Sequence, residues 1–144
     1  MSDSPVFLDS NICLYLLSTD SAKKHTAEIL LALPHTIIST QVISETINVG
    51  IKKFQLSHEQ LTAHIDFLTL SCEVILVSAE LQKKAMDIHF RYQLSFFDSL
   101  IIASALEANC LTLYTEDMQH KQVIENKLTL VNPFLSSVGS ISHL

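Results

Sequence analysis

The chain has 144 residues, of which 48% are hydrophobic and 17% are charged. This balance is typical of one domain with a buried core and excludes a disordered chain. The formal net charge of −6, from 9 Lys and Arg against 15 Asp and Glu, argues against a protein that coats DNA or RNA through a basic surface.

The sequence also bears on the compartment in which the protein acts. No apolar run reaches the roughly 20 residues that span a bilayer, and the first residues lack the basic region of a signal peptide. The three cysteines, Cys13, Cys72 and Cys110, are scattered and odd in number, which favours reduced core thiols. We therefore expect a cytoplasmic protein with no membrane partner.

Short apolar runs alternate with helical patterns along most of the chain. The apolar runs predict five strands, at 5–8, 36–39, 73–77, 111–114 and 128–131. Apolar periodicity and capping residues predict helices at 12–17, 22–33, 41–54, 58–70, 79–91 and 95–106. We assign no strand to the polar segment 118–126. Residues 1–135 are expected to form one domain, followed by a flexible tail at 136–144.

Strands that alternate with helices predict parallel βαβ units in an α/β sandwich. The functional cleft of such folds lies at the carboxyl ends of the strands. Acidic residues in or next to apolar segments are therefore the first candidates for a site.

Asp98 lies in a segment whose apolar residues surround almost the whole helix, and it is the only charged residue between Arg91 and Glu107. Burying a lone carboxylate costs several kcal/mol unless a cation, hydrogen bonds or a proton compensate it. A structural alternative is open, because Ser95 and Asp98 have the spacing of a helix N-cap and its third residue.

Three further acids have similar surroundings. Asp9 ends the first predicted strand, although it could simply cap the following helix. Glu45 is the only formal charge between Glu28 and Lys52 and lies beyond the first helical turn, where capping explains it less well. Asp117 follows the fourth strand, so all four carboxylates are expected to converge on one edge of the sheet.

Converging carboxylates repel one another, and a hard divalent cation is the usual compensation. Oxygen ligands without His or Cys select Mg²⁺ or Mn²⁺ over zinc, and the seven histidines show no metal-ligand spacing. Such a site can activate water and neutralise a phosphodiester during hydrolysis.

Other catalytic arrangements lack the residues that they need. With only two glycines, Gly50 and Gly139, the chain has no glycine-rich phosphate loop. It also has no Gly-x-Ser-x-Gly segment and no cysteine with a neighbouring histidine.

The sequence resembles the PIN-domain family, and most of all its toxin-type branch of VapC-like ribonucleases. Four segments carry the resemblance, at 6–11, 43–45, 94–103 and 113–117, and it extends to 128–134. It implies a three-layer α/β/α sandwich with a five-stranded parallel sheet, and RNA cleavage that depends on Mg²⁺ or Mn²⁺. It also implies an antitoxin partner and a homodimer.

The resemblance assigns roles to residues of this chain. Asp9, Asp98 and Asp117 would hold the metal, and Glu45 would be a further ligand or the base for the attacking water. The supporting polar groups would be Asn11 and Thr115. The family pattern of a hydroxyl residue, any residue and then Asp favours Asp117 over Glu116.

One departure from the family is Lys121, which occupies a position where close relatives usually have glycine. The lysine pairs at 23–24, 52–53 and 83–84 could contact phosphates or could simply be solvated. A non-catalytic PIN-fold module that binds RNA or protein remains the alternative function. A phosphatase with an aspartyl nucleophile ranks last, because Asn11 stands where a second Asp is usual.

Overall fold

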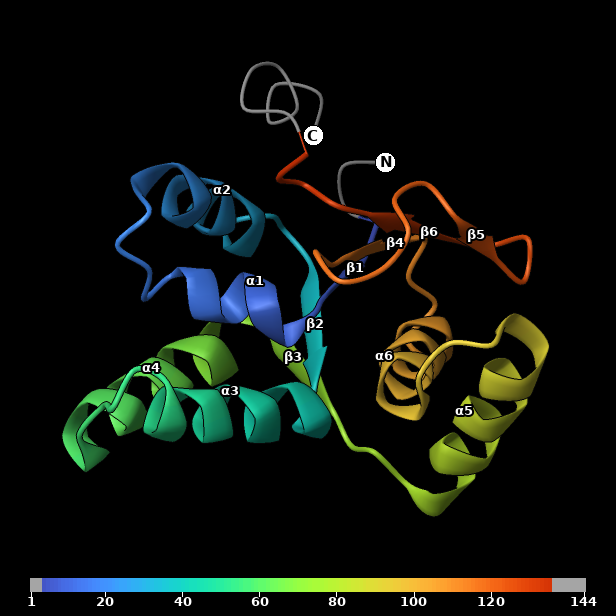
Figure 1. Cartoon of the computed structure of the whole chain (residues 1–144), viewed down its shortest axis with the longest axis horizontal. Helices are drawn as coiled ribbons and strands as arrows, with labels where there is room; N and C mark the ends of the chain where they lie inside the picture. The colour runs from blue at the N-terminus through green and yellow to red at the C-terminus, as the bar shows by residue number, and fades with distance from the viewer. Residues whose placement is uncertain (1–3, 136–144) are drawn as a thin grey trace.

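The computed structural model describes residues 4–135, and the predicted tail at 136–144 lies outside this range. The described chain alternates strands with one or two helices, as the apolar pattern predicts (Figure 1). In chain order the elements are β1 Val6–Leu8, α1 Ser10–Tyr15, α2 Ser21–Leu31, β2 Thr36–Ser39, α3 Thr40–Lys52, α4 His58–Ser71, β3 Glu73–Ile75, α5 Ala79–Tyr92, α6 Phe96–Glu107, β4 Thr112–Tyr114, β5 Val123–Ile124 and β6 Leu128–Val131.

The strands form one sheet in the order β3-β2-β1-β4-β6-β5. Strands β3, β2, β1, β4 and β6 run parallel, and β5 pairs antiparallel with β6 at the edge. In the centre of the sheet Val6 pairs with Thr36 on one side and with Thr112 on the other. The first three strands therefore follow one another from the centre of the sheet to one edge, and the connection from β3 to β4 crosses to the other side of β1.

This strand order decides where the helices lie. Parallel strands are joined by right-handed crossovers, so two successive steps in the same direction place their helices on the same face. Helices α1 to α4 accordingly cover one face, and α5 and α6, which join β3 to β4, cover the other (Figure 1). The predicted α/β sandwich is confirmed.

The sheet has one strand more than the five predicted. Residues Val123 and Ile124 lie in the polar segment 118–126, and only two residues pair with β6, so no alternating pattern marks them. Ile124 is fully buried, and the turn that follows has positive φ at Glu125 and Asn126. Strand β3 is also shorter than predicted and ends at Ile75.

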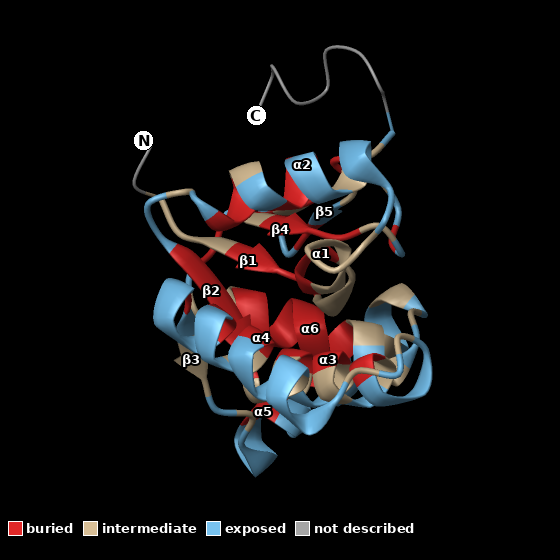
Figure 2. Ribbon diagram, turned by 90° about the vertical axis from the view of Figure 1, so that its left-hand side faces the viewer, coloured by how far each residue is buried: buried red, intermediate tan, exposed pale blue. Residues whose placement is uncertain are grey.

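Helix α6 is the most buried helix, as its sequence predicts, and it lies in the interior in Figure 2. Its polar residues Ser99 and Ser104 are compatible with this position because their hydroxyls donate to the carbonyls of Ser95 and Leu100, each at 2.8 Å. The three cysteines are buried free thiols. None of the described helices has both the length and the apolar character needed to cross a membrane.

Lys121 has a left-handed backbone with φ of 70°. Glycine adopts this conformation without strain, whereas a residue with a Cβ atom does so at a cost. The conformation is fixed by tertiary contact, since the Lys121 N–H donates to the Leu130 carbonyl at 2.7 Å. This geometry accounts for the glycine that the family resemblance implies at this position.

Candidate active site

The first two acids are placed by neighbouring central strands. Leu8 pairs with Tyr114 at the carboxyl ends of β1 and β4, so the residues after these strands emerge side by side. The link continues one residue further, where the Asp9 N–H donates to the Tyr114 carbonyl at 3.0 Å. Asp9 and the 115–117 segment thus share the edge where α/β folds carry their sites.

Asp9 is both a helix cap and a buried acid. Its Oδ1 accepts from the Ser10 N–H at 2.7 Å, which caps α1, and only 4% of the residue is exposed. Burial raises the pKa of Asp9 to about 7, against the hydrogen bonds from Thr115 and Ser10, and the charges of Glu45 and Asp117 raise it further. The capping contact is therefore present, but the hydrogen bonds to Asp9 do not offset the cost of burying its charged carboxylate.

One buried hydroxyl links Asp9 to the 115–117 segment. Thr115 is fully buried, and its Oγ1 donates to Asp9 Oδ2 at 2.8 Å while it accepts from the Asp117 N–H at 3.2 Å. The same side chain thus fixes the carboxylate of Asp9 and the backbone at Asp117.

We expect Thr115→Val to lower the free energy of unfolding by about 1–3 kcal/mol, since it leaves the Asp117 N–H and one Asp9 oxygen without a partner. The pKa of Asp9 should rise further, because the Thr115 hydrogen bond lowers it. Chemical denaturation and NMR titration would measure both effects. Thr115→Ser keeps the hydroxyl and is the matched control; equal losses in both variants would contradict the role of the bridge.

Asn11 contacts both acidic residues of the 115–117 segment, Glu116 and Asp117, in different ways. Its Nδ2 donates to Asp117 Oδ2 at 3.0 Å, and its Oδ1 accepts from the Glu116 N–H at 3.3 Å. Asp117 is exposed at the rim of the site. The Glu116 carboxylate instead contacts Lys23, at 2.7 Å, and the Tyr15 hydroxyl. Burial raises the pKa of Glu116, but these two hydrogen bonds outweigh it and hold the pKa below its usual value.

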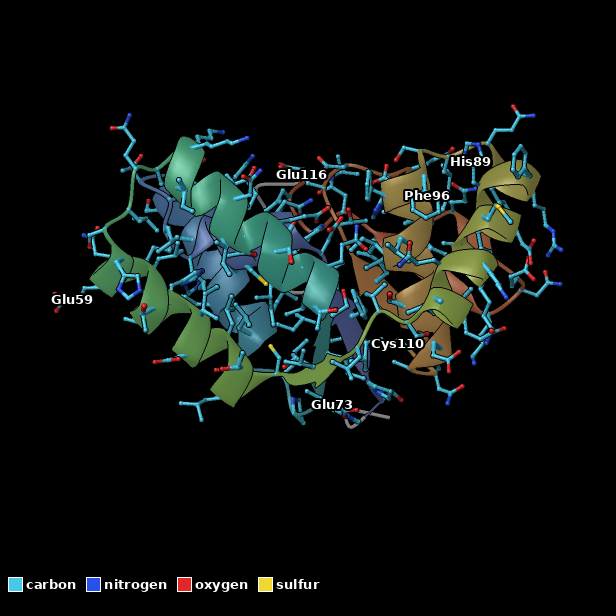
Figure 3. All side chains as sticks on the ribbon, turned by 90° about the horizontal axis from the view of Figure 1, so that it is seen from below. Glu59, Glu73, His89, Phe96, Cys110 and Glu116 are labelled. Carbon is cyan, nitrogen blue, oxygen red and sulfur yellow. The ribbon has the colours of Figure 1, made fainter. Side chains whose placement is uncertain are left out.

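Glu45 and Asp98 come from the two faces of the sheet. Figure 3 shows α3 and α6 on either side of the middle of the molecule, with Phe96 at the start of α6. Gln41 connects them, because its Nε2 donates to Glu45 Oε2 and to the Phe97 carbonyl, each at 3.1 Å. Glu45 is thereby tied to the first turn of α6.

Asp98 is the third residue of α6, and its N–H donates to Ser95 Oγ at 3.1 Å, so the predicted capping contact exists. The carboxylate is half-buried. Burial raises its pKa, the Ser95 hydroxyl lowers it, and the charges of Asp117 and Glu45 raise it again. Among residues 4–135, no Lys, Arg or His forms an ion pair with Asp98.

The four carboxylates line one hollow of about 260 Å³, which we call the acidic hollow. Sequence reasoning missed two polar residues here. Asn48 lines the hollow and Gln41 holds Glu45, and their helical spacing of three and four residues from Glu45 is the signal that could have found them. The complete lining is Asp9, Ser10, Glu45, Asn48, Val49, Asp98, Ile101 and Asp117.

The donor set of the acidic hollow fits a hard divalent cation, since carboxylate and amide oxygens are the ligands that Mg²⁺ and Mn²⁺ prefer. The side chains are not closed around one point. Within residues 4–135, no three His, Cys, Asp or Glu side chains form a group that could hold an ion as they stand. An ion in the hollow would therefore have to draw the carboxylates together.

A mostly parallel sheet with helices on both faces and acids at its carboxyl edge defines an α/β domain with an acidic site. The family model described as PIN domain matches residues 6–126, which is most of the chain. The protein belongs to the PIN-domain family, as its sequence motifs predict. No curated protein sequence matches the chain significantly.

Solved structures share this fold. A toxin–antitoxin complex from Klebsiella pneumoniae is 23% identical with a TM-score of 0.69, and the match covers 90% of this chain and 98% of that one. VapBC2 from Rickettsia felis, bound to promoter DNA, is 25% identical with a TM-score of 0.64 and coverages of 88% and 96%. VapC20 from Mycobacterium tuberculosis, a toxin that cleaves the sarcin–ricin loop, is 23% identical with a TM-score of 0.63 and coverages of 75% and 86%.

Proposed function

We propose that this protein is an endoribonuclease that hydrolyses RNA phosphodiester bonds with the help of Mg²⁺ or Mn²⁺. The observation that carries the proposal is the acidic hollow, which Asp9, Glu45, Asp98 and Asp117 line from four separate segments, and within residues 4–135 none of the four forms an ion pair with Lys, Arg or His. Membership of the PIN-domain family supports it, as does the likeness to VapC20, a toxin that cleaves the sarcin–ricin loop.

In this proposal Asp9, Asp98 and Asp117 hold the metal, which when bound activates water and neutralises charge on the phosphodiester. The surrounding residues position these acids. Thr115 orients Asp9, and Asn11 fixes one oxygen of Asp117.

Glu45 is either a further ligand or the base that takes a proton from the attacking water. Its contact with Gln41 holds one carboxylate oxygen and leaves the other available for this role.

We further propose that the protein is the toxin of a toxin–antitoxin pair, is inhibited by its antitoxin, acts in the cytoplasm and forms a homodimer. The likeness to the Klebsiella toxin–antitoxin complex and to VapBC2 supports an antitoxin partner. The spread of the four carboxylates favours one alternative, a non-catalytic module that binds RNA or protein through the same fold.

Incubation of purified protein with total cellular RNA and with short single-stranded RNAs tests the proposal. We expect new 5′ or 3′ ends to accumulate with Mn²⁺ or Mg²⁺ and to be absent with EDTA. RNA that is bound but stays intact with both metals would instead support the non-catalytic module. Cleavage that continues unchanged in EDTA would contradict the metal dependence.

A further inference from the structure

A second hollow, of about 560 Å³, adjoins the acidic hollow. The two share Val49, and Asn11 in the second follows directly on Ser10 in the first. It lies where α1 and α3 pack against each other (Figure 1), with Tyr15 from the end of α1 and Lys53 and Phe54 from the chain after α3. We call it the aromatic hollow.

The aromatic hollow has the size and lining of a site for a planar ring. Tyr15 and Phe54 supply aromatic surface, and Asn11 and Ser18 supply hydrogen-bonding groups. Its volume lies in the range that accommodates small organic ligands. Stacking on aromatic side chains, combined with a nearby cation, is how proteins bind single-stranded nucleic acid without reading its sequence.

Tyr15 is held in place before any ligand arrives. Its hydroxyl contacts Glu116 and accepts from Lys23 Nζ at 3.0 Å, and its ring meets the Phe134 ring edge-on with centroids 4.8 Å apart. A wall that is already ordered loses little conformational entropy on binding.

The charges around the aromatic hollow also suit a nucleotide. Glu116, whose carboxylate would repel a phosphate, is neutralised by Lys23 at 2.7 Å. Lys53 is exposed, and among the described residues it forms no ion pair. Among residues 4–135, Lys53 is thus a cation without an ion-pair partner that lies beside the two aromatic rings of the hollow.

We propose that the aromatic hollow binds a nucleoside of single-stranded RNA next to the phosphodiester held at the acidic hollow. The base lies against Phe54 and Tyr15, and Lys53 contacts an adjoining phosphate. This inference rests on the proposed ribonuclease function and adds a subsite that positions the substrate. A protein segment is the other occupant that could cover such a surface, and the experiment separates the two.

Fluorescence anisotropy with a labelled single-stranded RNA octamer in EDTA measures binding without cleavage. Phe54→Ala should weaken binding roughly tenfold through lost stacking. Lys53→Ala should reduce the slope of log K against log salt by about 0.7, the value for one phosphate contact on a single strand. Lys52→Ala is the matched control, because Lys52 is also exposed but does not line the hollow. If Phe54→Ala fails to fold, Phe54→Leu replaces it, because leucine removes the aromatic ring but keeps more of the apolar volume.

Wild-type affinity in Phe54→Ala or Phe54→Leu, or equal losses in Lys53→Ala and Lys52→Ala, would overturn the subsite. RNA that binds neither wild type in EDTA nor, with Mn²⁺ present, the Asp98→Asn variant used to block cleavage would overturn it too and would leave the hollow to a protein segment. Cleavage by wild type with Mn²⁺ is scored separately. If wild type cleaves RNA but Phe54→Ala and Lys53→Ala keep its affinity and KM, only the proposed subsite fails. If RNA binds through Phe54 but is never cleaved, only the proposed hydrolysis fails.

Discussion

Asp98→Asn is expected to lower the rate of metal-dependent RNA cleavage by at least about a hundredfold, because a metal ligand supports several kcal/mol of transition-state stabilisation. Cleavage of a fluorescent RNA under single-turnover conditions measures the effect. The matched control is Asp66→Asn, an exposed aspartate on α4 that undergoes the same loss of charge outside the acidic hollow. Wild-type cleavage by Asp98→Asn would contradict the assignment.

The same substitution should leave the fold intact. The capping contact at the start of α6 uses the backbone N–H of Asp98, which asparagine retains. Removal of the negative charge also relieves repulsion by Asp117 and Glu45. The unfolding temperature of metal-free Asp98→Asn should therefore equal or exceed that of wild type, and a marked fall would attribute the lost activity to unfolding instead.

The second large expected effect concerns stability and pH. Burial raises the pKa of Asp9 to about 7 in the folded protein, against a usual value of 3.8. The folded state therefore binds the Asp9 proton more tightly, and stability falls as pH rises from about 4 to about 7. Above pH 7 the loss levels off, at about 4 kcal/mol from this one carboxyl.

Urea denaturation of metal-free protein between pH 4 and pH 8 measures this effect as a difference from Asp9→Asn. Asparagine does not titrate, so the variant should gain stability relative to wild type as pH rises. Other carboxylates, such as Glu116 and Glu125, have a lowered pKa and change stability with pH in the opposite direction. Their contribution is the same in both proteins, so it cancels in the difference. A difference that stays constant across the range would contradict a raised Asp9 pKa.

Much of the fold could be predicted because local pattern and tertiary burial agree. Apolar residues surround almost the whole of α6, and this pattern correctly predicts that the helix is buried. Ser57 and Gln60 predict the start of α4, where the structure contains the capping box that they form. Strand β5 could not be predicted, because two residues carry no periodicity and their pairing depends on β6. Strand β3 ends at Ile75, and the Val77 N–H donates to the Thr40 hydroxyl at 3.1 Å, a contact between distant segments that the local sequence does not show.

The candidate site, too, could be predicted only in part from the sequence. Lone carboxylates in apolar segments are visible in the sequence, so Asp9, Glu45 and Asp98 could be selected from charge pattern alone. The contacts that orient them could not, because they join distant segments. Thr115 reaches Asp9 across 106 positions. The pairing of Glu116 with Lys23, 93 positions away, takes that acid out of the acidic hollow and leaves Asp117 at its rim.

Calorimetric titration of Mn²⁺ into chelator-treated wild type, Asp98→Asn and Asp66→Asn tests most directly that the acidic hollow holds a metal. We expect saturable binding by wild type and Asp66→Asn, and at least about tenfold weaker binding by Asp98→Asn. Heats of dilution alone from wild type, or equal affinity in all three proteins, would contradict it and would favour the non-catalytic module.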